Sequence, residues 1–504
     1  MFARPWLVTG LAAAAAGAAA FAVAGCSLLN PEPPTNLLVI AVEGLRLDAL
    51  RTALGAPRTP NIQRLTGAGV EFAWCFSHSS ATMPATTALL SARTPSTSRV
   101  RVDRQEVDAG LMLVQEHLRE AGWQTFGVLA SPDVVAPGDG LGLARGFHIA
   151  RTHPDVAPPA AAIGQELGPI LERADPETPW FAFVQFADPV APYASHGTAD
   201  RAARAVLDGK PLERIGTSDP RAWKRTLHVA PGAHRIEFQA DEDFVVARLE
   251  ATRGGEALPV AIVSGTLGRP TRSFVASFEA VGPVAAEIEV AALLHDAPDL
   301  AEIRARYRLE VESVDRAIGD LIALLERNGQ YDRTCIVLVA PHGESLGEHG
   351  EIGHGAALGD QLLRVPLVIK PPLNDESRAR LAGRRLDVVR LIDVVPTLLE
   401  MLDERPLQRA EGLSLLQAGE RQLLAEVHPP QARTSVLALR DARYKLVYTA
   451  GENRFEMYDV KSDTLELDNV FALQGHFRSK WQAQLRDLAE RAPLGADRQI
   501  GALR

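Results

Sequence analysis

The sequence predicts an α/β protein built on a doubly wound mixed sheet, and three observations lead to this fold class. The chain has 504 residues, of which 46% are apolar and 23% are charged, a composition that suits a large folded domain with an appendage. Continuous apolar runs such as Asn36–Val42 are typical of strands buried on both faces of a parallel sheet. These runs alternate with amphipathic segments, as expected when helices connect the strands.

The elements of this sheet can be assigned in chain order. Further apolar runs predict strands at 124–130, 180–186, 334–340 and 366–369, and helical periodicity predicts helices at 60–65, 110–121, 301–328 and 392–402. The longest helix has the clearest pattern, with apolar residues at helical spacing and Gly329 as its stop. These apolar residues are Tyr307, Val311, Val314, Ile318, Leu321 and Leu325.

Residues 215–295 interrupt this alternation. They contain short strand candidates at 225–229, 234–238, 244–249, 260–263, 273–278 and 287–290. Short strands at regular spacing predict an inserted β-sandwich-like module of about 80 residues. The predicted plan is a signal peptide, a tether, the α/β domain in two parts around the insert, and a C-terminal subdomain. The signal peptide is 1–25 and the tether is 26–35. The α/β domain comprises 36–200 and 299–430, the insert is 201–298, and the C-terminal subdomain is 431–504.

The N-terminus has the pattern of a secretory signal. A short basic start at residues 1–4 precedes an alanine-rich apolar run that ends at Gly25. The sequence at 23–26 resembles the bacterial lipobox, in which the cysteine, here Cys26, is acylated and becomes the first mature residue. Ser27 then implies an outer-membrane location. An uncleaved helix is the alternative, because about 20 apolar residues can span a bilayer. Both interpretations place the rest of the chain in the cell envelope, outside the cytoplasm.

Charge and cysteine content limit the partners and the covalent structure. A net charge of −10 argues against nucleic acid, because phosphate binding requires a basic surface. Export permits disulfides, but Cys75 and Cys335 lie in apolar, strand-like segments. We therefore expect them to be unpaired core residues.

Ligands in open α/β sheets gather at the carboxyl ends of the strands, and polar motifs follow two of the predicted strands. Glu43 follows the first strand, and the sequence 341–355, which includes His342, Glu344 and His354, follows the strand at 334–340. A third motif contains Thr82, two residues before Pro84 and a helical segment. Thr82 is placed either to act beside an anion at a helix N-terminus or simply to cap that helix.

These motifs together resemble the sulfatases and their relatives in the alkaline phosphatase superfamily. The resemblance covers about 36–200 and 300–470, and it implies the sheet of that superfamily with a small C-terminal antiparallel sheet. It also implies a metal site formed by Glu43, Thr82 and His342. Thr82 takes the place of the nucleophile, and His354 takes the place of a histidine that contacts the substrate anion.

The sequence also departs from the family pattern at several positions. Threonine at position 82 cannot become formylglycine, although threonine is the nucleophile in phosphate-processing relatives. Thr86 replaces an arginine or histidine, and Val190 stands where relatives usually carry histidine. Pro341 replaces a metal-binding aspartate, which weakens the expected site for one divalent ion (zinc, manganese, magnesium or calcium).

Three functional hypotheses follow from these observations. The first is a hydrolase or transferase acting on sulfate or phosphate esters, with an anionic ester or glycan as substrate. The second is a catalytically silent protein of the same fold that binds a ligand or partner. The third is a structural lipoprotein that uses the insert as its contact surface. In each case the lipid anchor binds the membrane, and the insert is a candidate site for protein or carbohydrate.

Overall fold

The computed structural model describes residues 35–50, 59–131, 133–134, 141–153, 159–190, 204–212, 222–254, 256–264, 270–281, 285–296, 300–373, 376–417, 419, 421–429, 434–473 and 476–491. The predicted signal peptide, Cys26 and all of the tether except residue 35 lie outside these ranges. Within them, no helix is both long and apolar enough to cross a membrane.

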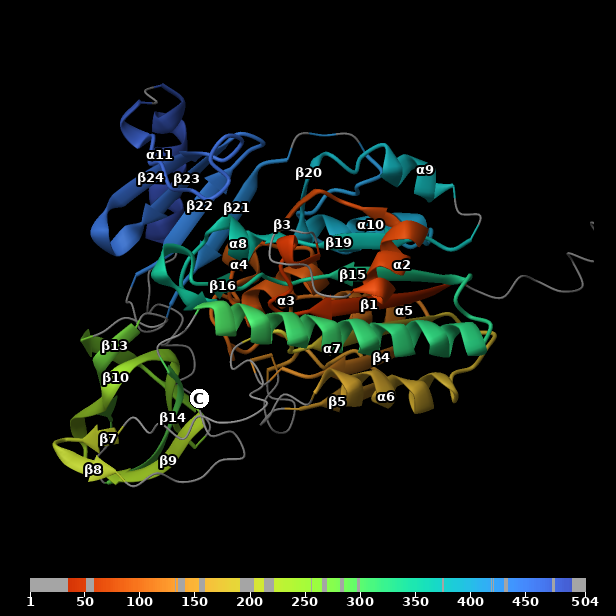
Figure 1. The fold of residues 1–504 in the computed structure, drawn as a ribbon. Helices are drawn as coiled ribbons and strands as arrows, with labels where there is room; N and C mark the ends of the chain where they lie inside the picture. Colours follow the sequence, from red (N-terminus) through yellow and green to blue (C-terminus); the bar gives the residue numbers. More distant parts are fainter. Residues whose placement is uncertain are drawn as a thin grey trace, which may run out of the picture.

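The central sheet has seven strands in the order β2-β19-β15-β1-β6-β4-β5 (Figure 1). Their bounds are Val70–Glu71, Leu367–Lys370, Thr334–Val339, Asn36–Val42, Trp180–Phe186, Gln124–Leu129 and Ile149–Thr152. The five strands from β15 to β5 are parallel, whereas β19 pairs antiparallel to β15, and β2 antiparallel to β19. The predicted doubly wound mixed sheet is therefore confirmed, and β1 and β6 have the predicted bounds.

Helices cover both faces of the sheet. On one face α7 (Leu300–Arg327) packs beside α2 (Pro60–Ala68) and α6 (Ala160–Leu171), and Figure 1 shows α7 running along the sheet. On the other face α3 (Thr82–Ser91) packs with α5 (Val114–Glu120) and α10 (Val394–Met401). The predicted helix at 110–121 begins later, at Val114, where the Glu116 carboxylate accepts the N–H of Leu113. The helix predicted at 392–402 begins later than predicted, at Val394, because Leu391–Asp393 form a 3-10 turn.

The long helix α7 joins these layers. Its six predicted apolar positions are all buried, which confirms the face inferred from their spacing. Its Asp315 also caps α2, since the carboxylate accepts the N–H of Asn61 (3.3 Å) and of Ile62 (2.8 Å). Thr59, at the N-cap position of α2, makes no side-chain hydrogen bond to the first N–H groups of the helix. The side chain of Asp315 accepts from these N–H groups in its place.

The inserted module forms one eight-stranded antiparallel sheet with the central order β12-β13-β10-β14-β9. The strands β7 to β14 span Arg204–Leu207, Lys210–Leu212, Ala222–Val229, Gly232–Arg253, Glu256–Leu258, Val260–Ser264, Pro270–Ala280 and Ala286–Asp296. The prediction of separate strands at 234–238 and 244–249 is wrong, because both belong to β10. β13 pairs with β10 on both sides of an irregularity between Gln239 and Phe244, and β14 pairs with β10 from Phe244 onward. Both halves of β10 contribute side chains to one core.

The C-terminal region contains a four-stranded antiparallel sheet, β21 to β24, with helix α11 against it. Their bounds are Leu423–Val427, Val436–Arg440, Tyr444–Thr449, Arg454–Asp459 and His476–Arg491. The sequence placed the start of this subdomain at residue 431, but its first strand, β21, lies before that residue. β21 belongs to this sheet because it pairs with β22.

The remaining elements are short. A three-stranded sheet contains β18 (Arg364–Val365), β3 (Trp74–Phe76) and β20 (Val388–Arg390), and β16 (Ser345–Leu346) pairs with β17 (Ile352–Gly353). The short helices are α4 (Pro95–Ser98), α8 (Asp360–Leu363) and α9 (Ser377–Ala382). Cys75 in β3 and Cys335 in β15 are both buried and form no disulfide bond, as expected for core residues.

Candidate active site

The candidate site lies at the edge where the parallel strands β15, β1, β6 and β4 all end. Glu43 directly follows β1, and Gln185 is the next-to-last residue of its neighbour β6. The loop after β15 brings His342 to the same edge, and the turn after β4 brings Ser131 there. Residues that are far apart in sequence converge because carboxyl ends of parallel strands share one edge.

Thr82 is the first residue of α3 and faces the loop after β15. Its Oγ1 lies 2.9 Å from Nε2 of His342, and both side chains are fully buried. The alternative role of Thr82 as an N-cap is wrong, because Ala81 occupies that position and makes no side-chain cap bond. The Met83 N–H in the first turn donates instead to Asp103 Oδ1 (2.8 Å). Thr82 therefore leaves its hydroxyl for His342.

The hydrogen bonds of His342 define its tautomer. Its Nδ1 lies 2.8 Å from the Gly343 carbonyl oxygen, which can only accept, so Nδ1 carries the proton and Nε2 accepts from Thr82. Burial and the charge of His354 hold the pKa of His342 well below its usual range, although the Gly343 bond opposes them. His342 is thus a neutral imidazole with its lone pair directed at the Thr82 hydroxyl.

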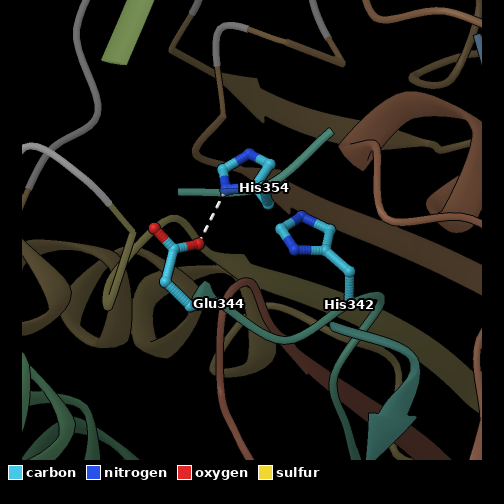
Figure 2. Close-up of side chains that lie close together, drawn as sticks. All are labelled: His342, Glu344 and His354. Atoms are coloured by element: carbon cyan, nitrogen blue, oxygen red, sulfur yellow. Dashed lines mark hydrogen bonds and ion pairs between the residues drawn. The ribbon is translucent and has the colours of Figure 1, made fainter. Parts of the chain in front are cut away.

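His354 lies beside His342, with ring centroids 4.2 Å apart, and pairs with Glu344 (Figure 2). Nδ1 of His354 is 2.7 Å from Glu344 Oε2. Burial alone would lower the pKa of His354, but the charge and hydrogen bond of Glu344, with Asp103 and Asp133, raise this pKa to about 9. His354 is therefore a cation at neutral pH, which suits contact with an anion.

Glu43 is buried among polar side chains. Its Oε1 accepts a 2.6 Å hydrogen bond from Gln185 Nε2, and Ser131 provides another hydrogen bond. Burial and the negative charge of Asp133 raise the pKa of Glu43 well above its usual value. A carboxyl group in this state readily exchanges its proton for a bound cation.

This geometry can be compared with known proteins. A family model described as "Sulfatase" matches residues 35–404, which is more than half of the chain and includes all of these side chains. The chain belongs to the sulfatase family.

Several relatives and solved structures support this sulfatase assignment. The multifunctional alkaline phosphatase superfamily protein PehA of Trinickia caryophylli is 30% identical over 228 residues, which cover 39% of this chain and 41% of PehA. The chain thus spans about two fifths of the length of this curated relative. The crystal structure of a phosphonate monoester hydrolase of Agrobacterium radiobacter has a TM-score of 0.60 and 19% identity, with 91% of this chain and 96% of that chain covered.

Another neighbour is described in complex with its substrate D-glucosamine-2-N,6-O-disulfate. It has a TM-score of 0.60 and 16% identity, and the superposition covers 91% of this chain and 98% of that chain. At these identities the two solved structures establish a shared fold. The predicted alkaline phosphatase/sulfatase architecture is therefore confirmed.

The departures of this sulfatase-family chain from the family motifs also lie at the site. Thr86 accepts a long hydrogen bond (3.5 Å) from Gln185, which connects it to Glu43. Val190 packs against Gly44, where a β-carbon would lie 2.8 Å from Val190 Cγ1. Pro341 is buried directly before His342 and offers no side-chain donor. A neutral hydroxyl, an apolar side chain and a proline thus occupy the places where the family resemblance predicts charged or metal-binding groups.

The donors that remain fit a divalent ion, which sulfatase-family folds generally bind. One atom from each of His342, Glu344 and His354 lies within 4.8 Å of the other two, and His354 would have to lose its proton to act as a ligand. Nitrogen and carboxylate donors suit zinc, manganese or magnesium.

Sequence reasoning did not identify the acids on the β4 side of the site. Asp133 and Asp103 both influence the charge of Glu43 and of His354. Asp133 lies four residues after the end of β4, so a search after every predicted strand would have found it. Asp103 lies between α4 and α5, and the sequence carried no comparable signal for it.

Proposed function

We propose that this sulfatase-family chain is a lipid-anchored, metal-dependent hydrolase or transferase of sulfate or phosphate esters, with Thr82 as the nucleophile. The observation that carries the proposal is the 2.9 Å contact between Thr82 Oγ1 and the neutral His342. It lies beside a positively charged His354, at the carboxyl edge of the parallel sheet. The nucleophile, its partner and an anion-binding group are thus in one buried place.

The side chains of this chain would then have distinct tasks. A divalent ion, held by Glu43, Thr82 and His342, would lower the pKa of the hydroxyl and neutralise the ester oxygens. Thr82 Oγ bonds to sulfur or phosphorus as the bond to the leaving alcohol breaks, and the alcohol takes up a proton. Water or an acceptor alcohol then releases the group from Thr82. His354 contacts the anionic oxygens.

The proposed substrate is an anionic ester, with sulfated or phosphorylated glycans as the first class to test. One structural neighbour is described with a disulfated glucosamine as its substrate. The insert is the proposed contact surface for a glycan or protein. It follows β6, which ends at the same edge of the sheet as the site, and it is followed by α7. Figure 1 shows it beside the end of α7 where β16 also lies.

The alternative is a catalytically silent sulfatase-family protein that binds a ligand or partner. Pro341 and Val190 favour it, because both remove polar groups that relatives place at this site. A structural role carried by the insert is the remaining possibility, in which changes at Thr82 would have no functional consequence.

The test is ester hydrolysis by the full chain, purified in detergent, with Zn²⁺, Mn²⁺, Mg²⁺ or Ca²⁺ and with a chelator. The substrates are aryl sulfate, phosphate monoester, phosphonate monoester and sulfated glucosamine. We expect metal-dependent turnover that Thr82→Ala abolishes. Thr87→Ala is the matched control, because Thr87 is buried in the same helix and its hydroxyl has no hydrogen-bond partner. Turnover that survives Thr82→Ala would exclude Thr82 as the nucleophile, and no turnover with any ion would favour the silent protein.

The envelope location is tested separately. With Cys26 acylated, the full chain should fractionate with outer membranes and carry a lipid mass on its N-terminal residue. Cys26→Ser should move it to the soluble fraction or leave an uncleaved signal. A Cys26→Ser protein that keeps a cleaved N-terminus and stays in the membrane would contradict lipid anchoring.

A further inference from the structure

The loop after β15 continues into a short β-hairpin, residues 344–354, that carries the charged pair of the site. Its strands β16 and β17 pair antiparallel. Glu344 directly precedes β16 and His354 directly follows β17, so the pairing of these strands brings the two side chains together (Figure 2). The position of this hairpin therefore sets where the imidazole of His354 lies relative to Thr82.

Arg46, in the loop after β1, binds this hairpin at two points. Its Nη1 donates to the Glu344 carbonyl oxygen (3.0 Å) and to Oε1 of Glu348 (2.9 Å). The other carboxylate oxygen of Glu348 accepts the N–H of Leu346 (2.6 Å). One guanidinium nitrogen thus contacts both the residue that pairs with His354 and the turn that closes the hairpin.

The Arg46 side chain is itself held in one direction. Its Nε and Nη2 donate to the two oxygens of the Asp48 carboxylate (2.9 and 2.7 Å), a geometry that fixes the plane of a guanidinium. The backbone N–H of Arg46 donates to the Tyr307 hydroxyl (2.9 Å), which donates to the Gly44 carbonyl oxygen (2.8 Å). Arg46 and Tyr307 are both buried. The guanidinium is thus anchored on the loop after β1 and on α7.

Helix α7 also contacts the hairpin directly. Arg304 Nε donates to the Leu346 carbonyl oxygen (3.2 Å). Gly347, at a φ of +104°, lies against Leu300, and a β-carbon there would be 2.6 Å from Leu300 Cδ2. The turn of the hairpin therefore requires glycine for both its conformation and this close approach. The first turns of α7 and the Arg46 side chain hold the hairpin together.

We propose that Arg46, supported by Tyr307, is a positioning residue of this site. It docks the hairpin on the loop after β1 and thereby keeps His354 beside His342. Burying an arginine is costly and is weak evidence for a gain in stability, whereas a fixed geometry is what a reacting site requires. The inference rests on the proposed function, in which His354 contacts the ester anion, and Arg46 acts on that contact through Glu344.

The experiment compares Arg46→Met with wild type by amide hydrogen exchange of the full chain, purified in detergent. Exchange at 344–354 should become at least about tenfold faster while exchange at 334–339 in β15 changes less than about twofold, because only the hairpin loses its anchor. Arg421→Met is the matched control, since Arg421 is also buried and donates to the Ser414 carbonyl oxygen (2.9 Å) in another part of the chain. It should leave exchange in the hairpin unchanged.

A milder variant guards against a failure of Arg46→Met to fold. Tyr307→Phe removes only the hydroxyl that joins the Arg46 N–H to Gly44. It should accelerate exchange in the hairpin in the same way but by a smaller factor. Unchanged exchange in the hairpin of both variants, or equal acceleration along the whole chain, would overturn the inference.

Kinetics separate positioning from a loss of folded protein. With the ester that the wild-type chain turns over, Arg46→Met should raise KM by at least about tenfold, because His354 no longer meets the anion in place. A partly unfolded variant would instead lower kcat and leave KM unchanged, and that result would overturn the positioning role. A wild-type chain without turnover would contradict the proposed function, and hydrogen exchange would still decide whether Arg46 holds the hairpin.

Discussion

The candidate site and the junction between α8 and the C-terminal sheet both bury charged side chains, but they pair their charges differently. At the junction, Asp360 contacts Arg440 (2.9 Å) and Lys445 (3.3 Å), and Lys445 also contacts Glu466 (2.6 Å). Two carboxyl groups thus meet two cations. The Arg440 guanidinium additionally stacks 4.0 Å from the centre of the Phe76 ring.

At the candidate site, by contrast, the buried acids and one imidazolium shift the pKa values of their neighbours. Glu43, Asp103, Asp133 and Glu344 act on one charged imidazole, that of His354. A cluster of ion pairs between two elements holds parts of a fold together, whereas buried groups with strongly shifted pKa values at the end of a sheet are typical of a functional site. The comparison predicts that changes at the site alter chemistry and binding, and that changes at the junction alter stability.

The largest expected effect is on catalysis. Thr82→Ala should lower kcat for the ester that the wild-type chain turns over by at least about 10³-fold, because it removes the nucleophile itself. Its melting temperature should stay close to that of Thr87→Ala, measured by calorimetry. Equal losses of activity in Thr82→Ala and Thr87→Ala would break the comparison, since a general packing defect would then explain both.

The next effect concerns the junction. Arg440→Met should lower the free energy of unfolding by about 3–5 kcal/mol, the usual cost of removing one partner from a buried ion pair. Arg443→Met is the control. Arg443 directly precedes β23, and its exposed ion pair with Asp459 should contribute less than about 1 kcal/mol. Thermal unfolding provides both values. A junction variant that changes the Mn²⁺ affinity but not the stability would reverse the roles of the two clusters.

A smaller, pH-dependent effect is expected at Asp188, which connects β6 to α6 through the Ala160 N–H (3.1 Å). Burial and the charge of Glu310 raise the pKa of Asp188 to about 7. The folded chain therefore binds more protons than the unfolded chain between about pH 4 and 7, and stability falls as the pH rises through this interval.

Asp188→Asn removes this penalty. The variant should be more stable than wild type by up to about 4 kcal/mol at pH 8, and equal to it below about pH 4. Glu310→Gln should give a change of the same sign, since it removes the like charge. Denaturant unfolding at the two pH values checks both variants, and a difference that grows toward acid pH would contradict the assignment.

Much of the fold could be predicted from local patterns. The apolar runs gave β1 and β6 their bounds, and the periodicity of α7 identified its buried face. The boundary of β10 could not be predicted, because the residues between Gln239 and Phe244 have no apolar alternation. Pairing with β13 and β14 keeps that segment in one strand.

The sequence by itself determined the family, the sheet and the motifs that contain Glu43, Thr82, His342 and His354, because these depend on residue identity and spacing. Only the tertiary structure decided that Thr82 faces His342 and does not cap its helix, and that Asp103 and Asp133 influence the pKa of Glu43. Those contacts depend on which strands end side by side. Strand order is set by packing and pairing over the whole chain, and no local pattern contains it.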